Sequence, residues 1–466
     1  MASLHELSAA EIAAQYEGGT LSPVEATRAL LDRIDAGEPR LNAMYLVDRE
    51  GALKQARDAE GRWRVQAPLS ALDGVPVTIK ENIHTRGHPA PLGTAANLPA
   101  APQAADAPPA ARLREAGCVI LGKTTMPDYG MLSSGLSSAH GVTRNPWNTA
   151  KNTSGSSSGA GAAAAARYAP LHLGTDIGGS VRLPATHCGI FALKPSLGRV
   201  PVYPPYLGRV TGPMTRDVES AAMMMNWLSL PDARDFMSLP YRALDYAEGL
   251  EALDLRKLKI GFLPDMRAGL PVHAEVAAAA QAAAQALEGA GAAVEEMKSF
   301  LTPAMLDGIG RFFEARSHND LLALSPERQK KVLPFLAEWC TWRAKDFSGR
   351  DVMQAYAQVM AMREAAVAAC ETYDYVISPV SPILPYAAEL PCPGNDPHDA
   401  LPHIAFTVPY NMSEQPAASV NWSFSKDGLP IGVQLVGRRF DDAGVLKLSR
   451  AIEMARPAQR PWPDPA

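Results

Sequence analysis

The sequence predicts an α/β protein that folds as one large domain. Two apolar stretches, at 258–262 and 293–296, flank an alanine-rich helical stretch at 272–289. A strand–helix–strand order of this kind forms two parallel strands of one sheet. No internal repeat or low-complexity linker divides the 466 residues, and α/β enzymes can reach this length as one elaborated domain.

Residues 1–65 are expected to hold two N-terminal helices. Ser8 and Ser22 each stand three residues before a glutamate, in Ser-Ala-Ala-Glu and Ser-Pro-Val-Glu. This is the capping-box pattern, in which the serine and the glutamate satisfy free backbone N–H groups at the start of a helix. Pro23 follows Ser22 at the first helical position, where proline is favoured.

The stretch at 71–80 is expected to deliver a lysine to the interior. Residues 75–79 alternate like a short buried strand, and Lys80 follows at its end. Burial lowers the pKa of a lysine because a dry environment disfavours its charged form. A neutral Lys80 can then act as a general base.

Two clusters of glycine and serine, at 152–161 and 174–180, flank an apolar segment. Alanines at 162–166 suit a helix, and 171–175 indicates a buried strand that ends in the turn Asp-Ile-Gly-Gly-Ser. Successive N–H groups of such a turn can point into one concavity that holds an anion. Ser180, at the end of the turn, can place its hydroxyl beside a carbonyl whose oxygen lies in that oxyanion hole. A serine needs a base to remove its proton, and Lys80 is the candidate.

These residues resemble the amidase signature family over nearly the whole length of the chain. The resemblance is carried by Lys80, the Gly-Ser-Ser-Ser-Gly cluster at 155–159, the run at 174–184 and Gly-Ile-Phe-Ala-Leu-Lys-Pro at 189–195. It implies a single α/β/α domain with a central mixed β-sheet that helices cover on both faces. It also implies an enzyme without a metal or organic cofactor, and a homodimer.

The resemblance assigns roles to individual residues. Ser180 matches the nucleophile, Ser156 a bridging serine that follows a cis peptide bond, and Lys80 the base. The implied oxyanion hole consists of the N–H groups of Ile177, Gly178, Gly179 and Ser180. The implied substrate-binding and supporting residues are Gly130, Met131, Leu132, Ser157, Thr175, Asp176 and Arg182. Asp176 and Arg182 are expected to pair and to hold the nucleophile turn rigid.

The chain divides by pattern into four segments of the one domain. They are the N-terminal helices at 1–65, the catalytic core at 66–225, a more variable and largely helical region at 226–370, and a C-terminal return to the sheet at 371–466. Further strands are expected at 118–121, 375–379 and 429–437, and further helices at 110–116 and from about Ala443.

Three other catalytic motifs match the sequence without their structural context. The P-loop pattern at 117–124 has an apolar, strand-like middle where small residues should wrap a phosphate. The nucleophile-elbow pattern at 155–159 needs a preceding strand, which the polar residues 145–153 are not expected to form. The Ser-x-x-Lys pattern at 423–426 precedes an Asp-Gly turn. His187 and Cys188 are expected to be neighbours on a strand and to point to opposite faces, so they make no catalytic pair.

Composition excludes several classes of protein. The chain is 47% hydrophobic and 20% charged with a net charge of −5, which is ordinary for a globular protein and argues against a nucleic-acid surface. No run of about 18 apolar residues and no signal-peptide pattern occurs, so no membrane association is expected. Five scattered cysteines without a Cys-x-x-Cys motif indicate reduced thiols and a cytoplasmic protein, without a zinc site.

The predicted function is hydrolysis of the C–N bond of a small or medium amide through a serine acyl-enzyme. Met131, Leu132 and Trp422 are taken as pocket residues that favour an apolar or aryl substrate. Two alternatives stay open. One is the amidase subunit of a transfer-RNA-dependent amidotransferase, which releases ammonia from glutamine for a partner protein. The other is a hydrolase of a carbamate or urea.

Overall fold

A central sheet of eleven strands runs through the computed structural model, which describes residues 3–464. The strand order is β1-β3-β2-β8-β10-β9-β14-β15-β13-β11-β12. The sheet is mixed. Strand β2 is parallel to β3 and β8, and β13 is parallel to β11, whereas neighbouring strands in the middle of the sheet, β8-β10-β9-β14-β15-β13, are antiparallel. The strands are β1 Met44–Val47, β2 Pro76–Lys80, β3 Val119–Thr124, β8 Leu171–Asp176, β9 Phe191–Lys194, β10 Val210–Thr215, β11 Lys259–Phe262, β12 Ala293–Glu296, β13 Tyr375–Pro379, β14 Ala417–Phe424 and β15 Pro430–Gly437.

Four short strands form two small ribbons outside this sheet: β4 Leu136–Ser137 with β5 Gly141–Val142, and β6 Arg144–Asn145 with β7 Asn148–Asn152. The helices are α1 Ala9–Glu17, α2 Pro23–Leu41, α3 Arg49–Arg64, α4 Pro108–Glu115, α5 Ser158–Ala165, α6 Arg182–Cys188, α7 Val218–Leu228, α8 Ala274–Gly289, α9 Pro303–Leu322, α10 Pro326–Gln329, α11 Pro334–Thr341, α12 Gly349–Cys370, α13 Val408–Met412 and α14 Asp442–Ala455.

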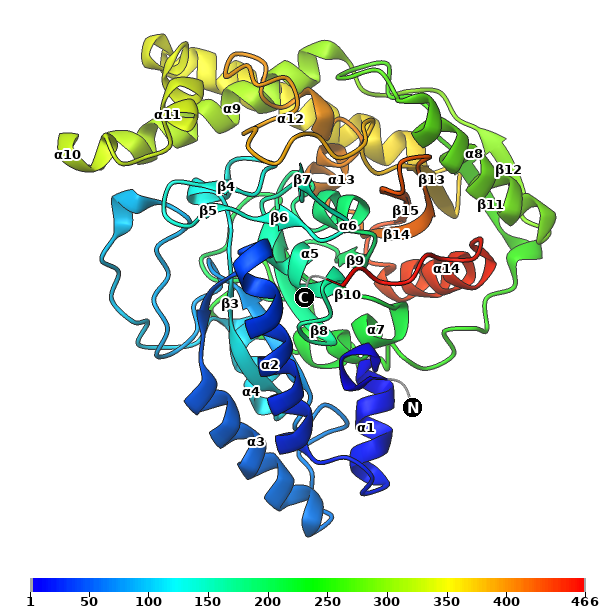
Figure 1. Ribbon diagram of the computed structural model, residues 1–466. Coiled ribbons are helices and arrows are strands. Elements are labelled where there is room, and N and C mark those ends of the chain that lie inside the picture. Colours follow the sequence, from blue (N-terminus) through cyan, green and yellow to red (C-terminus); the bar gives the residue numbers. More distant parts are fainter. Residues whose placement is uncertain (1–2, 465–466) are drawn as a thin grey trace.

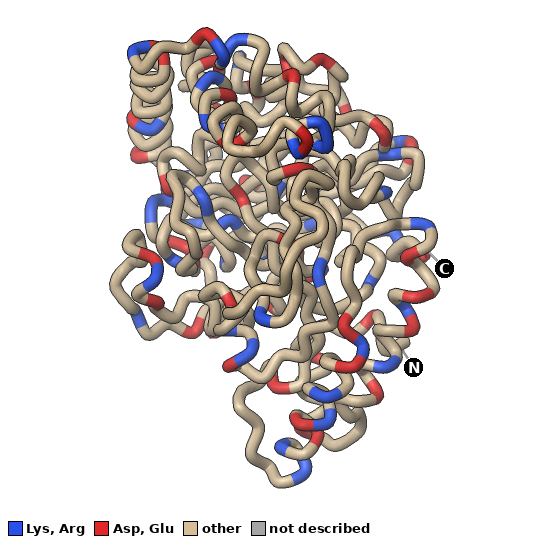
Figure 2. Tube along the Cα trace, turned by 90° about the vertical axis from the view of Figure 1, so that its left-hand side faces the viewer, with Lys and Arg blue, Asp and Glu red and all other residues tan. Residues whose placement is uncertain are grey.

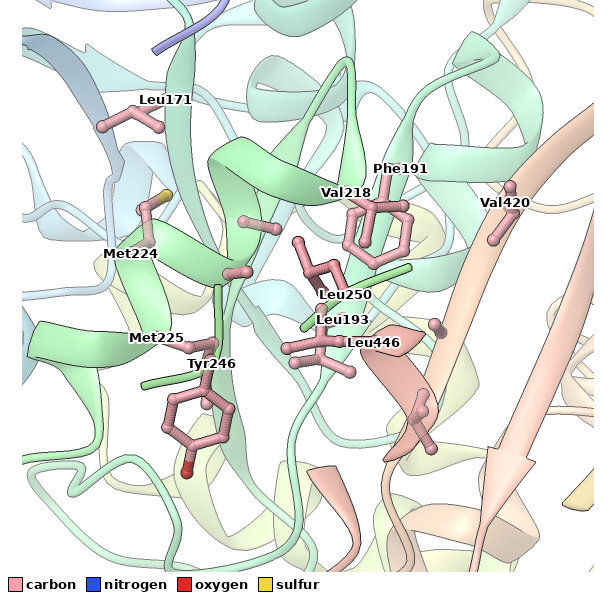
Figure 3. Close-up of a cluster of buried hydrophobic side chains, with 14 of the residues drawn as sticks. Leu171, Phe191, Leu193, Val218, Met224, Met225, Tyr246, Leu250, Val420 and Leu446 are labelled. Carbon is pink, nitrogen blue, oxygen red and sulfur yellow. The ribbon is translucent and has the colours of Figure 1, made fainter. Parts of the chain in front are cut away.

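Helices cover both faces of the sheet, which is why its central strands are almost entirely buried. On β3, Ile120 belongs to the largest apolar cluster, whereas Val119 and Leu121 pack on the opposite face with α2, α3 and α5. The largest cluster joins the sheet to α7 and α14. In Figure 3, Leu171 and Leu193 from the strands lie with side chains of these helices. The fold is therefore an α/β architecture with a mixed central sheet, as the sequence predicted.

Helices α9, α11 and α12 lie together at one end of the molecule, away from α1 to α4 (Figure 1). Their apolar faces pack with Leu132 and Ile404, which belong to the core of the molecule. Helices α9 to α12 make up most of residues 303–370, within the region at 226–370 that was expected to be largely helical. The position of these helices is important for function because Phe313 and Arg316 of α9 reach the cavity described below.

Charged residues of both signs are intermixed along the chain in the view of Figure 2, with long uncharged stretches between them. Within residues 3–464, no helix combines the length and the apolar composition that crossing a membrane requires.

Most of the predicted elements are present. The two capping boxes at Ser8 and Ser22 form as expected, and β11 and β12 are parallel neighbours on either side of α8. Residues 119–124 form strand β3, as expected for the apolar P-loop-like string. Strand β1 and helix α3 were not predicted from the sequence. The exposed face of α3 is highly polar, and only small alanines, Ala52, Ala56 and Ala59, are buried.

Two local predictions are wrong. Residues 148–152 do form a strand, β7, whose positions alternate between exposed and partly buried up to the buried Asn152. It pairs with β6 and bridges to Ala387 through Lys151, so its polarity reflects a surface ribbon. A nucleophile elbow follows a strand of the central sheet, and β7 lies outside that sheet. The Gly-Ser-Ser-Ser-Gly string at 155–159 is therefore still not a nucleophile elbow. His187 and Cys188 end helix α6 and do not lie on a strand. Pro184 falls in the first turn of α6, where a proline is tolerated.

Candidate active site

Two parallel strands and one helix bring the candidate catalytic residues together. Strands β2 and β8 are neighbours, with Ile79 opposite Leu173, so both strands end at the same edge of the sheet. Lys80 ends β2, and the turn with Ser180 follows β8 directly. The loop before α5 brings Ser156 and Ser157 to the same edge.

The amine of Lys80 is surrounded by three hydroxyl oxygens. Its Nζ lies 2.8 Å from Oγ of Ser156, 3.0 Å from Oγ of Ser157 and 2.9 Å from Oγ1 of Thr175. The side chain is fully buried and makes no ion pair within residues 3–464. Burial lowers the pKa of Lys80 to about 7, because removal from water disfavours the ammonium form.

The neighbouring hydroxyls determine how Lys80 is oriented. Ser157 donates its one hydroxyl proton to the carbonyl of Thr175 over 3.2 Å, so its oxygen can only accept from Lys80. Thr175 Oγ1 also accepts from the amide of Asn82 over 3.1 Å. A neutral amine has two N–H donors and one lone pair. When its donors face Ser157 and Thr175, the lone pair faces the hydroxyl of Ser156.

The peptide bond between Gly155 and Ser156 is cis. Ser156 and Ser180 both line a cavity of about 70 Å³, together with Gly130, Met131 and Leu132. The hydroxyl of Ser156 therefore lies between the lysine and the cavity that holds Ser180.

The turn that carries Ser180 is fixed by the carboxylate of Asp176. Oδ1 accepts from the N–H of Gly179 over 2.8 Å, and Oδ2 accepts from the N–H of Val181 over 3.1 Å. Gly179 has φ +132°, and a Cβ there would lie 2.5 Å from Oγ1 of Thr407, so only glycine fits. The N–H groups of Ile177, Gly178 and Ser180 have no partner among residues 3–464, and all three residues line the cavity.

Asp176 is paired with Arg182 in the interior. Both side chains are fully buried, and Nε and Nη2 of Arg182 donate to the two carboxylate oxygens over 3.1 Å each. Burial alone would raise the pKa of the Asp176 carboxyl, but the charge and hydrogen bonds of Arg182 hold that pKa well below its usual range. Arg182 also donates to the Thr407 carbonyl and to the side chains of Gln434 and Asn411. The predicted ion pair is therefore present, and each nitrogen of the guanidinium donates at least one hydrogen bond.

Replacing Arg182 by methionine is expected to destabilise the protein by about 3–5 kcal/mol, because the carboxylate of Asp176 stays buried without its partner. The free energy of unfolding, measured by urea titration, tests this. Arg311→Met is the matched control. Arg311 pairs with Asp307 on the surface, and such exposed pairs contribute at most about 1 kcal/mol. Equal, small losses in the two variants would contradict the assigned role of Arg182.

A larger cavity of about 330 Å³ continues from the first. Its lining is mostly apolar and includes Ile83, Leu92, Val332 and Leu336. Asn82, Tyr129, Met131, Thr175, Arg209 and Arg316 line both cavities. The site is therefore a polar catalytic end joined to an apolar chamber.

The structure brings most of the predicted residues together, but it adds others. Trp422 does not line either cavity. It is buried in the sheet on β14 with the main apolar cluster, because its strand lies in the middle of the sheet. Asn82, Arg209 and Arg316 were missed. Asn82 could have been found, since it stands two residues after Lys80 at the end of a strand, whereas the two arginines carry no local signal.

Comparison with known proteins gives a consistent result. The family model described as Amidase matches residues 25–446. The chain is 34% identical over 479 residues to an acylamidase of Rhodococcus erythropolis, covering 99% of this chain and 97% of that protein. It is also 34% identical over 479 residues to a Glutamyl-tRNA(Gln) amidotransferase subunit of Myxococcus xanthus, covering 97% of each.

The crystal structure of a bacterial aryl acylamidase of the amidase signature family is similar to this structure with a TM-score of 0.90, at 28% identity and over 98% of each chain. At this coverage the likeness includes the central sheet and the helices on both of its faces. The chain therefore belongs to the amidase signature family of carbon–nitrogen hydrolases.

Proposed function

We propose that the protein hydrolyses the C–N bond of a small or medium amide with an apolar or aryl part, through an acyl-enzyme on Ser180. The arrangement that supports this most directly is the buried amine of Lys80 beside Ser156, whose hydroxyl lies on the wall of the same cavity as Ser180. A buried base, a bridging hydroxyl and a nucleophile in a concave site are what serine acyl transfer needs.

In the proposed first step, neutral Lys80 takes the proton of Ser156 while Ser156 takes that of Ser180. The oxygen of Ser180 then bonds to the carbonyl carbon of the amide, and the π electrons of that carbonyl move to the carbonyl oxygen. The N–H groups of Ile177, Gly178 and Ser180 stabilise that oxyanion. Gly179 was included in the oxyanion hole on the sequence, but its N–H is engaged by Asp176. Each oxyanion donor is typically worth about 3–4 kcal/mol in the transition state.

The same protons then return in the opposite direction. Lysine protonates Ser156, and Ser156 protonates the departing nitrogen, so the C–N bond breaks with loss of a neutral amine or ammonia. A water molecule enters, loses a proton through the same relay and attacks the ester carbon. Release of the carboxylic acid restores the hydroxyl of Ser180. General acid–base assistance of this kind contributes about 10²–10⁴-fold to the rate.

The substrate class follows from the two cavities. Met131 and Leu132 lie next to the serines, and the chamber beyond them is walled by apolar side chains. A chamber of this size with apolar walls fits an alkyl or aryl group of the substrate better than a strongly solvated group. Carbamates and ureas share the same carbonyl chemistry and remain within the proposal as related substrates.

The second candidate is the glutamine-hydrolysing subunit of a transfer-RNA-dependent amidotransferase. The 34% identity to the Myxococcus xanthus protein over 97% of each chain favours it. Such a subunit delivers its ammonia to a partner protein. If this candidate is correct, the purified chain releases little ammonia from simple amides and hydrolyses glutamine when the partner is present.

The experiment that separates the two is release of amine or ammonia by the purified chain alone. The panel contains aliphatic amides, anilides, lactams, a carbamate, a urea and glutamine, with Ser180→Ala as the control. Turnover of apolar amides or anilides, lost in the control, supports the self-sufficient hydrolase. Activity confined to a trace on glutamine contradicts it and favours the amidotransferase candidate.

The proposed setting is the cytoplasm, since all five cysteines are unpaired and buried. The proposed assembly is a homodimer, which rests on the family resemblance. Light scattering of the purified chain tests the dimer directly.

A further inference from the structure

Two arginines stand where the catalytic cavity meets the apolar chamber. Arg209 precedes β10, and Arg316 lies on α9, so the two are 107 positions apart in the sequence. Both line both cavities. Neither was expected from the sequence, and neither has a part in the proposed relay.

The two arginines make few hydrogen bonds with residues 3–464. A guanidinium group has five N–H donors. Arg209 donates from Nη1 to the carbonyl of Pro204 over 3.1 Å. Arg316 has the hydroxyl of Tyr206 as a hydrogen-bonding neighbour, and its nearest carboxylate oxygen, on Asp320, is 3.8 Å away. Both arginines are partly exposed, so their remaining donors can reach a ligand in the cavity.

The ring of Tyr206 holds the two guanidinium groups near each other. The guanidinium carbon of Arg316 lies 4.2 Å from the ring centroid, and that of Arg209 lies 5.3 Å from the same point. The two guanidinium carbons are therefore no further apart than the sum of these two distances. Stacking on an aromatic face fixes the plane of a guanidinium and leaves its edge donors free.

The charges at this junction are not balanced. Asp320 is the one carboxylate among the described residues that line the two cavities, and its side chain is half exposed, so its pairing with Arg316 is weak. Burial and the nearby positive charge of Arg316 lower the pKa of Arg209 to about 10. Two cations thus share a partly desolvated site with one half-exposed carboxylate, which leaves an excess positive charge that a further anion would neutralise.

We propose that the substrate amide also carries a carboxylate, and that Arg209 and Arg316 bind this carboxylate at the junction of the two cavities. This substrate class rests on the proposed amide hydrolysis and specifies which amides are hydrolysed. Monoamides and monoanilides of dicarboxylic acids, and N-acyl amino acids, are the substrate class. A carboxylate accepts paired N–H donors of guanidinium groups in a planar geometry, which gives both affinity and orientation.

The two cavities can bind a substrate that carries both a carboxylate and an apolar group. The scissile carbonyl lies by Ser180, the carboxylate lies by the arginines, and the apolar remainder fills the chamber lined by Leu92 and Leu336. The guanidinium of Arg209 is also close enough to Lys80 to lower its pKa. A substrate anion at Arg209 offsets only this smaller effect. Burial, the main cause of the lowered pKa of Lys80, remains, and Ser157 and Thr175 still orient the amine.

The test compares matched substrates in the full-length protein. One pair is the monoanilide of succinic acid and the methyl ester of that monoanilide, and a second pair is an N-acyl glycine and its methylamide. Wild type is expected to prefer the carboxylate in at least one pair by about 10- to 100-fold in kcat/KM, as for charge-assisted hydrogen bonds. This ratio is expected to fall towards one in Arg209→Met and in Arg316→Met. Arg209→Lys keeps the positive charge but loses the paired N–H donors of the guanidinium group, and it is expected to retain part of the preference for the carboxylate.

Arg311→Met is the matched control, because Arg311 lies on the same helix as Arg316 and pairs with Asp307 on the surface. It is expected to keep the wild-type ratio. Equal kcat/KM for acid and neutral partner in wild type, or ratios unchanged in both arginine variants, overturns the inference while amide hydrolysis itself stands.

A binding measurement separates failure of this inference from failure of the proposed function. Calorimetric titration of Ser180→Ala with glutarate and with dimethyl glutarate needs no turnover. Preferential binding of glutarate, lost when Arg209→Met is added, supports the anion site even if no amide in the panel is hydrolysed. Absence of any preference for glutarate contradicts the anion site whatever the activity.

Discussion

Ser180→Ala is expected to lower kcat for every amide substrate by at least about 10⁴-fold, while the protein stays folded. The hydroxyl of Ser180 is the proposed attacking group, so its removal leaves no acyl-enzyme path. The residual rate then comes from substrate binding and the oxyanion donors alone. Steady-state turnover and the release of product in a single turnover both measure the loss.

A neighbouring serine provides the matched control. Ser158 begins helix α5, and among the described residues its hydroxyl donates only to the carbonyl of Thr125, over 3.5 Å. Ser158→Ala removes the same atom from a fully buried position outside the cavity, whereas Ser180 is partly exposed on the cavity wall. It is expected to keep kcat within a few-fold of wild type. A similar fall in both variants would point to damage of the fold and would contradict the assignment of Ser180 as nucleophile.

The catalytic edge could be predicted because its signals are local. A buried strand that ends in lysine, and a second strand that ends in a Gly-Gly-Ser turn, are each readable within about ten residues. The fold then needs only to make these strands parallel neighbours, which β2 and β8 are. Asp176 and Arg182 were likewise close enough in sequence for their pairing to be expected.

The features that sequence analysis missed depend on distant contacts. Arg209 and Arg316 come near each other only because α9 lines the same cavities as the residues before β10, and either arginine alone is indistinguishable from a surface charge. Trp422 was assigned to the pocket by its aromatic character, yet the central position of β14 buries it in the core. Helix α3 buries only alanines, which give a weak apolar stripe.

Lys80→Met is expected to lower kcat/KM by about 10²–10⁴-fold, the usual contribution of a positioned general base. In wild type, kcat/KM is expected to rise with pH and to level off above about 7, because the pKa of Lys80 is lowered to about 7 and only the neutral amine accepts a proton. The variant is expected to lose this inflection. Lys194→Met is the control. Lys194 is another buried lysine whose pKa burial lowers to about 7, and within the part of the chain that the structure describes its amine donates only to the Pro195 carbonyl.

The stability of the same variants gives an independent check on the state of Lys80. A lysine with a pKa of about 7 when folded, against 10.5 as the ordinary value, binds fewer protons in the folded than in the unfolded protein between these pH values. Stability therefore rises with pH across that window, by up to about 1.4 kcal/mol per pH unit for one such group. Wild type is expected to gain stability relative to Lys80→Met as the pH rises from 7 towards 10.5. Because Lys123 and Lys194 are present in both proteins, their contributions cancel in this difference. A difference that stays constant with pH would mean that Lys80 is charged in the folded protein, and a charged lysine has no lone pair with which to deprotonate Ser156.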